Sequence, residues 1–161
     1  MTDYLKGWVK IKRNDVLNQA VADLSQFATI IHQTHWYMRG NGFLTLHPKM
    51  DEFMDEVNDW LDEIAERLIT LGGSPYSTLR EFSEHTKLTD EKGSYEKTMT
   101  EHLETLLIGY RYLQDLAEEG IEASSAENDA ITEDIFIDIK GAVEKKIWMV
   151  SAHLGRSPEI N

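Results

Sequence analysis

Four long segments of the chain repeat apolar residues at intervals of three or four, and this periodicity constrains the fold more than any other feature. Such spacing places the apolar side chains along one face of an α-helix, and that face must be buried against other helices. The chain has few β-branched runs and three prolines in 161 residues, which also favours helix over strand. The sequence therefore predicts an all-α protein.

The glycine and proline residues between these segments predict where each helix begins and ends. We expect helices over residues 14–39, 48–71, 94–119 and 126–154, with Gly120 ending the third and Pro48 in the first turn of the second. The second carries either Trp60 or Leu61 in its core stripe, and the fourth carries Ile131. The motif LREFSEH reads as a short helix inside the long crossover between the second and third helices. Four helices with one long connection describe a ferritin-like four-helix bundle over residues 14–161.

The second predicted helix carries two pairs of metal-ligating residues. His47 and Asp51 are four residues apart, as are Asp62 and Glu66, so each pair shares one helix face. The pairs are nearly in phase but lie roughly 16 Å apart along the axis, so one ion cannot bind both pairs of one chain. A second copy running antiparallel across a two-fold axis would bring each carboxylate pair opposite the other chain's His47 and Asp51. The spacing, with His35 nearby, predicts a metal site between subunits.

Taken alone, a pair such as His47 and Asp51 is usually a surface hydrogen bond, and a pair such as Asp62 and Glu66 is usually a solvated face. The whole helix face argues for more, because its carboxylates repel one another unless a cation or a partner relieves them. The crowded residues are Asp51, Asp55, Asp59, Asp62 and Glu66. Mixed nitrogen and oxygen ligands suit ferrous iron, manganese or zinc. No histidine follows a glutamate by three residues, so a ferritin-type di-iron site inside one subunit is not expected.

These motifs together resemble the Dps proteins, or mini-ferritins, and most of all their Gram-positive peroxide-resistance branch. The resemblance covers nearly all of the chain after residue 13, and its ligand spacing is specific. It is carried by His35-Trp36, Gly42-Phe43, His47-Pro48-Lys49-Met50-Asp51, Leu61-Asp62-Glu63, Glu66-Arg67, Gly72-Gly73, Asn128-Asp129, Thr132-Glu133-Asp134-Ile135-Phe136 and Lys146-Ile147-Trp148-Met149.

The resemblance implies a hollow shell of twelve subunits with two-iron ferroxidase sites at two-fold interfaces. His35, His47 and Asp51 would come from one subunit, and Asp62 and Glu66 from its neighbour, with Glu66 best able to bridge two irons.

The resemblance also implies roles around that site. Trp36 would pack beside it, and His32 would support it by packing or hydrogen bonding rather than as a sixth ligand. Asp129 and Asp134 match positions that line the family's three-fold iron pores. By themselves these two acids also read as helix N-terminal charges favoured by the macrodipole.

The first thirteen residues form a basic and aromatic tail on an otherwise acidic protein of net charge −13. Such acidity attracts cations and repels nucleic acid, or simply makes the surface soluble. Tail cations interleave with Tyr4, Trp8 and other apolar residues, which suits either docking on the body or contact with DNA phosphates. The cations are Lys6, Lys10, Lys12 and Arg13.

The resulting functional hypothesis is an iron-storage ferroxidase of the cytoplasm. It would oxidise Fe(II) to Fe(III), preferentially with hydrogen peroxide, and mineralise the product inside the shell, which protects against oxidative stress. No membrane association is expected, because the sequence has no membrane-length apolar run and no signal peptide; the absence of cysteine fits the cytoplasm. Two alternatives stay open: a shell that compacts DNA through its tail, and a plain helical scaffold whose carboxylate face makes a dimer.

Overall fold

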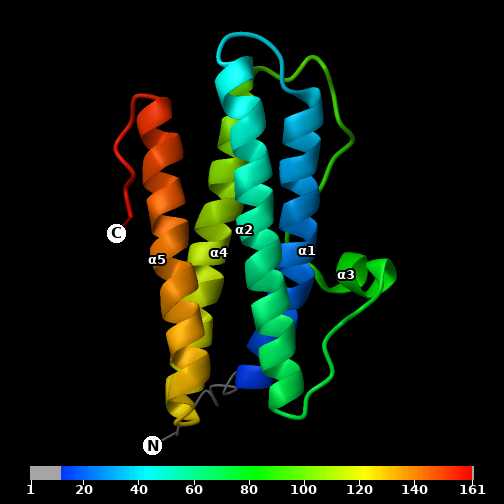
Figure 1. The fold of residues 1–161 in the computed structure, drawn as a ribbon, viewed down its shortest axis with the longest axis vertical. Coiled ribbons are helices and arrows are strands. Elements are labelled where there is room, and N and C mark those ends of the chain that lie inside the picture. The colour runs from blue at the N-terminus through cyan, green and yellow to red at the C-terminus, as the bar shows by residue number, and fades with distance from the viewer. Residues whose placement is uncertain (1–11, 161) are drawn as a thin grey trace, which may run out of the picture.

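The computed structural model describes residues 12–160 and contains four long helices and one short helix (Figure 1). The helices are α1 (Arg13–Tyr37), α2 (Phe43–Thr70), α3 (Leu79–His85), α4 (Met99–Ala126) and α5 (Ala130–His153). In Figure 1, α1 is antiparallel to α2 and α4 is antiparallel to α5, and the connection that carries α3 climbs the length of the bundle. The predicted ferritin-like bundle, with a short helix in its long crossover, is confirmed.

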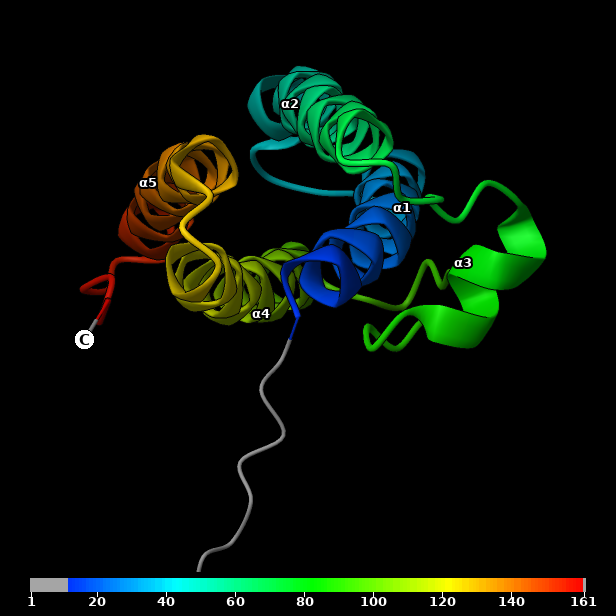
Figure 2. The same cartoon turned by 90° about the horizontal axis from the view of Figure 1, so that it is seen from below.

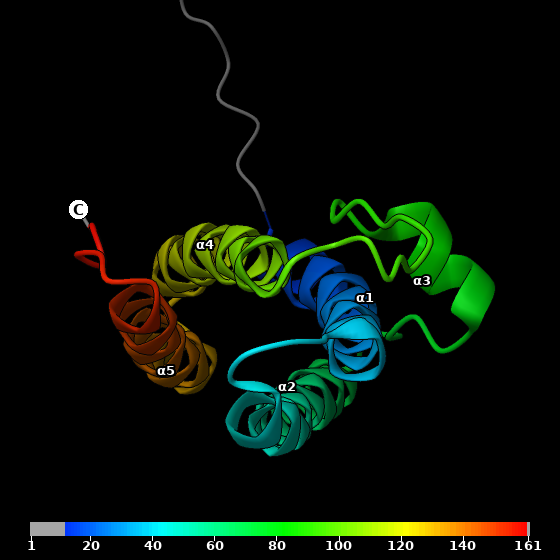
Figure 3. The ribbon, with the colours of Figure 1, turned by 90° about the horizontal axis from the view of Figure 1, so that it is seen from above.

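Seen along its axis, the bundle is a ring in which α1 neighbours α2 and α4, while α5 closes the ring beside α4 (Figure 2). Helix α3 lies outside the ring, beyond α1 (Figure 3). The apolar stripes of all four long helices meet in one core, with side chains such as Phe27, Met50, Tyr110 and Phe136 fully buried. Within residues 12–160, no helix is long and apolar enough to cross a membrane.

The prediction that α2 begins near Pro48 is wrong, because residues 43–46 are helical and Pro48 lies inside the helix. Gly42 is the N-cap and has a φ of +87°, which lets the chain reverse and enter the helix at once. Its carbonyl accepts from the backbone N–H of Leu46, whose side chain joins the core. Burial of Leu46 therefore stabilises an additional helical turn before the proline.

The predicted ends of α4 and α5 also need correction. Gly120 lies inside α4 because it makes room for a core side chain: a β-carbon there would come within 2.4 Å of the Phe136 ring. Helix α4 begins five residues later than predicted, at Met99, because Thr98 and Glu101 form a reciprocal capping box. Helix α5 begins at Ala130, where Asp129 is the N-cap.

Two predictions about the core stripes are decided by burial. On α2 the buried side chain is Trp60, while Leu61 is only half-buried. On α5 Ile131 is 62% exposed, so its assignment to the core is wrong. Because α5 starts four residues later than predicted, Ile131 lies in its first turn, and the core face begins with Thr132 and Phe136.

A buried carboxylate fastens the crossover to the bundle. Asp23 of α1 is fully buried and accepts hydrogen bonds from Thr86 Oγ1 and the Lys87 N–H at 2.8 Å each. It also accepts one from the Tyr112 hydroxyl at 2.6 Å and one from the Gln19 amide at 2.9 Å. Burial, reinforced by the hydrogen bond to Asp23, raises the pKa of Tyr112 far above its usual range, so the phenol remains a donor.

Replacing Asp23 with alanine is expected to lower the free energy of unfolding by about 3 kcal/mol, because buried donors on the crossover and on α4 lose their acceptor. Thermal unfolding of the assembled protein at fixed concentration measures the change. Asp15→Ala, which removes an exposed carboxylate from the same helix, is the matched control. Equal unfolding temperatures for the two variants would contradict the anchoring role.

A buried histidine makes the stability depend on pH. His102 is 2% exposed, and its Nε2 has no hydrogen-bond partner among the described residues. Burial and then the charge of Lys97 lower the pKa of His102, although a hydrogen bond with the Tyr37 backbone acts in the opposite direction. The unfolded chain therefore binds this proton more readily than the folded chain does.

The free energy of unfolding should consequently fall as the pH drops below about 6.5, the ordinary pKa of histidine. The fall should continue until the pH reaches the lower pKa that His102 has in the folded protein. His102→Gln removes this proton uptake and should flatten that part of the curve of unfolding temperature against pH. His153→Gln, at an exposed position at the end of α5, is the control. A wild-type slope in the His102→Gln variant would refute the assignment.

Candidate metal centre

The turn between α1 and α2 brings His35 and His47 face to face. Their rings stack with centroids 3.7 Å apart, and each Nδ1 lies within hydrogen-bond distance of the other residue's backbone carbonyl. The two distances are 2.9 Å, from His35 Nδ1 to the His47 oxygen, and 3.0 Å for the reverse pair. A carbonyl oxygen only accepts, so each Nδ1 must carry a hydrogen and donate it. Both Nε2 atoms then keep the lone pair that a metal needs.

A carboxylate lies next to this histidine pair. His35 Nε2 is 3.6 Å from Asp51 Oδ1, one turn of α2 beyond His47. The His35 side chain is 14% exposed whereas Asp51 is 57% exposed, so the group opens outward from the bundle. Phe43 stacks on His47 at 4.8 Å and helps to fix that ring. His35 thus has two of the other predicted ligands as neighbours, the stacked His47 ring and the Asp51 carboxylate, although the three side chains are not close enough to hold an ion by themselves. We call His35, His47 and Asp51 the histidine half-site.

The other two predicted ligands lie near the opposite end of α2. Asp62 and Glu66 are exposed and line an open hollow of about 420 Å³, which we call the carboxylate hollow. Its other lining residues are Asp59, Glu63, Arg67, Thr70 and Ile135. In residues 12–160 no three histidine, aspartate or glutamate side chains gather closely enough to hold a metal ion. Neither half of the predicted set is therefore a complete site within one chain.

The residues predicted to flank the site form a pair on α1. His32 and Trp36 stack in parallel with ring centroids 4.9 Å apart. Trp36 is 65% exposed in the single chain, an unusual state for a large aromatic side chain. The stack holds the exposed indole parallel to the His32 ring.

The two predicted pore residues differ sharply in environment. Asp129 is buried at the start of α5 and forms ion pairs with Arg13 at 2.9 Å and Arg67 at 2.8 Å. Burial alone would raise the pKa of Asp129, but hydrogen bonds from Thr132 and the charge of Arg67 outweigh it and lower the pKa below its ordinary value. Asp134, one turn later, is exposed.

The predicted DNA-contacting residues lie at the edge of the described chain. Lys6 and Lys10 fall outside it, and Lys12 is exposed. Arg13 is the first residue of α1, and its guanidinium contacts Asp129 and also Glu127, at 3.6 Å. Arg13 is therefore part of an ion network at this end of the bundle.

The predicted site set omits Arg67, which lines the carboxylate hollow. The sequence offers one weak signal for it, a cation in the last turn of a helix, where the macrodipole favours positive charge. Its partners on α5 are 62 and 65 positions away in the sequence, so local spacing could not reveal them.

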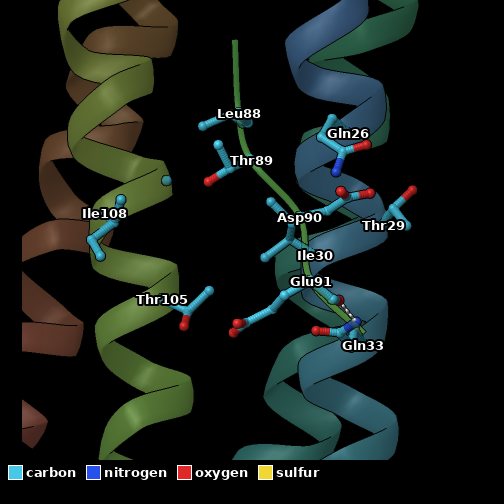
Figure 4. A pocket seen from close by; sticks show the side chains of 11 residues that line it. Gln26, Thr29, Ile30, Gln33, Leu88, Thr89, Asp90, Glu91, Thr105 and Ile108 are labelled. Carbon is cyan, nitrogen blue, oxygen red and sulfur yellow. Dashed lines mark hydrogen bonds between the residues drawn. The ribbon is translucent and has the colours of Figure 1, made fainter. Parts of the chain in front are cut away.

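A separate cavity of about 280 Å³ lies between α1, α4 and the crossover segment 88–91 (Figure 4). Gln33 donates to the Glu91 carbonyl at 2.7 Å, and the Glu91 carboxylate pairs with Lys97 at 2.9 Å. No histidine lines this cavity, so it does not extend the metal centre.

Comparison with known proteins places this geometry in a family. Residues 14–160 match the model of the ferritin-like domain. The DNA protection during starvation protein of Streptococcus suis is 52% identical over 145 residues, which cover 90% of this chain and 84% of the relative. The protein of the same name from Listeria monocytogenes is 43% identical, over 92% of this chain and 95% of the relative. The chain belongs to the Dps family.

Solved Dps structures agree with this assignment. The crystal structure of Listeria monocytogenes Dps has a TM-score of 0.91 at 42% identity and covers 93% of this chain and 97% of that one. Staphylococcus aureus Dps has a TM-score of 0.83 at 32% identity, with 89% and 97% covered.

Proposed function

We propose that this Dps protein is a ferroxidase and iron store that oxidises Fe(II) with hydrogen peroxide at sites shared between two subunits. The observation that carries the proposal is the reciprocal hydrogen bonding of His35 and His47, which leaves both Nε2 atoms free to bind metal beside the Asp51 carboxylate. A pair of surface histidines without this arrangement would have no fixed tautomer.

The separation of the two half-sites along α2 supports a site between subunits. Asp62 lies eleven residues after Asp51, or roughly 16 Å along a helix, too far for a shared ion. A two-fold axis relates identical surfaces, so the carboxylate hollow of each chain would meet the histidine half-site of the other. In such a dimer, the exposed Trp36 side chain and the carboxylates of Asp62 and Glu66 would lie in the interface between the two subunits.

The donor set suits iron as a substrate. Two imidazoles and three carboxylates form a nitrogen and oxygen set that accepts ferrous iron, which unlike zinc can change oxidation state. Carboxylates stabilise the ferric product more than the ferrous substrate, because the higher charge gains more from anionic ligands. Structures of the similar Listeria innocua Dps come from crystals soaked with zinc and with cobalt.

The reaction consumes peroxide and ferrous iron together. Two ferrous ions give one electron each to one hydrogen peroxide molecule, which takes up two protons and leaves as two water molecules. Ferrous ions would reach the sites through acidic pores lined by residues at the start of α5, and ferric product would mineralise in a cytoplasmic shell of twelve subunits. The oxidant would thereby be kept away from free iron, which suppresses hydroxyl-radical formation.

Mixing two inactive variants tests the sharing of the site. Random pairing of a His35→Ala/His47→Ala chain with a Glu66→Gln chain makes mixed dimers in which one of the two sites keeps all its ligands. We expect each variant alone to be inactive and the co-assembled mixture to recover about a quarter of wild-type ferrous oxidation by peroxide. Stopped-flow absorbance of the ferric product after anaerobic iron loading measures this recovery.

A site built within one chain gives the opposite result, because then every chain of the mixture carries a defect. Mixing the two preformed shells without dissociating them is the control for exchange and should give no recovery. Activity of the Glu66→Gln protein alone at the wild-type rate would show that the carboxylate half is not part of the site.

The relatives' name, DNA protection during starvation protein, favours DNA binding as a second candidate function, through the basic tail. This candidate predicts that exchanging Lys6, Lys10 and Lys12 for glutamine abolishes a DNA gel shift, and that raised salt weakens the wild-type shift steeply. Exchange of Lys140, Lys145 and Lys146 on α5 is a control of equal charge. A wild-type shift that survives the tail exchange would eliminate the tail as the contact.

A further inference from the structure

Arg67 connects the end of α2 to the start of α5 by a two-point contact. Its Nε donates to Thr132 Oγ1 at 2.9 Å, and its Nη2 donates to Asp129 Oδ1 at 2.8 Å. The side chains of Arg67 and Asp129 are 16% and 8% exposed, so solvent screens this ion pair only weakly. A planar guanidinium held at two points has a fixed orientation, which a lysine in its place would not have.

Asp129 has no lone pair left for a passing ion. A carboxylate offers about four acceptor positions. Besides Arg67, the donors to Asp129 are Arg13 Nη1 at 2.9 Å, the Thr132 N–H at 3.2 Å and the Thr132 hydroxyl at 2.5 Å. Asp134 on the next turn is exposed instead. The two acids at the start of α5 therefore differ in role: Asp129 accepts hydrogen bonds from within the protein, whereas Asp134 is open to solvent.

The contact lies beside the carboxylate hollow. Arg67 directly follows Glu66 in the sequence and lines the same hollow as Asp62 and Glu66. Four carboxylates line this hollow, and their repulsion works against a fixed geometry at the end of α2. A side chain held on α5 resists rotation and fraying of the helix turn that carries Glu66.

We propose that Arg67 and Asp129 are positioning residues for the metal centre. Asp129 holds the guanidinium of Arg67 on α5, and Arg67 in turn fixes the rotation of the last turns of α2, so that Asp62 and Glu66 face the partner's histidine half-site. The inference rests on the proposed function, in which these two carboxylates are ligands. It gives Asp129 a positioning role in place of the pore-lining role that family resemblance implies.

Exchange of Arg67 for methionine distinguishes a positioning role from a purely electrostatic one, because the two roles predict opposite changes in the affinity for a divalent cation. Loss of a cation beside four carboxylates should tighten binding of a divalent cation if charge alone matters. Positioning predicts instead that Co²⁺ binds the assembled protein about 10-fold or more weakly, as when residues that orient metal ligands are lost. Equilibrium titration with Co²⁺ gives the affinity, and the visible absorption of bound Co²⁺ reports whether its coordination has changed.

Matched variants complete the test. Asp129→Asn should weaken Co²⁺ binding and alter the absorption spectrum of the bound ion. The Co²⁺ affinity of Arg67→Lys should lie between those of Arg67→Met and the wild type. Asp138→Asn, which changes an exposed acid of α5, should alter neither the affinity nor the spectrum. Shell size by gel filtration identifies any variant that fails to assemble, and the conservative Arg67→Lys variant then carries the test.

Tighter or unchanged Co²⁺ binding in Arg67→Met, with the wild-type spectrum, would overturn the positioning role. So would equal behaviour of Asp129→Asn and Asp138→Asn. Failure of the proposed function gives a different result, because Glu66→Gln would then bind Co²⁺ as tightly as the wild type. If only the positioning role fails, Glu66→Gln still binds Co²⁺ more weakly than the wild type.

Discussion

The reversal of the chain between α1 and α2 is the constraint on which the candidate site depends. Gly40 and Gly42 have φ angles of +104° and +87°, which L side chains rarely adopt, and Met38 between the helices is buried. The reversal brings the last turn of α1 against the first turns of α2. The carbonyl of His35 belongs to that last turn, where no intrahelical donor remains, and the His47 imidazole supplies one. The same hydrogen bond therefore satisfies a carbonyl at the helix end and sets the tautomer of His47, one of the proposed metal ligands.

Helix α2 carries four of the five proposed ligands, all but His35 of α1, and is held at each end by a different neighbour. At its start the contact is with α1 through the reciprocal histidines, and at its end it is with α5 through Arg67. Between these contacts runs unbroken helix, so the distance from Asp51 to Asp62 is set by the helical rise rather than by a loop. A rigid spacer of this kind is what a site shared across a two-fold axis requires, because an error in one half-site would be repeated in its symmetry mate.

The sequence was sufficient for the fold class and for the order of the helices, although not for the start of α4 at Met99 or for the exposure of Ile131. Periodicity predicts the bundle, turn residues predict the crossover, and the recurrence at four residues predicts which side chains share a face. It was insufficient where packing overrides a local rule. Pro48 usually marks a helix start, yet burial of Leu46 draws the preceding turn into α2. Gly120 usually marks a helix end, yet here it makes room for the Phe136 ring. In both cases the deciding contact comes from the core rather than from neighbours in the sequence.

The limits of sequence reasoning are most visible in the charged groups at the start of α5. Asp129 reads from its position as a charge at a helix N-terminus, and in the structure it is the N-cap, which accepts from the Thr132 N–H. Nothing in the local sequence indicates that guanidinium groups from α1 and α2 also converge on it. Arg67 lines the carboxylate hollow, but its Nε and Nη2 donate to Thr132 and Asp129, and the four carboxylates of the hollow outnumber the one cation that lines it. A divalent cation bound in the hollow would neutralise this excess negative charge, so in the proposed function the contact that holds Arg67 on α5 would also leave the carboxylates available to iron.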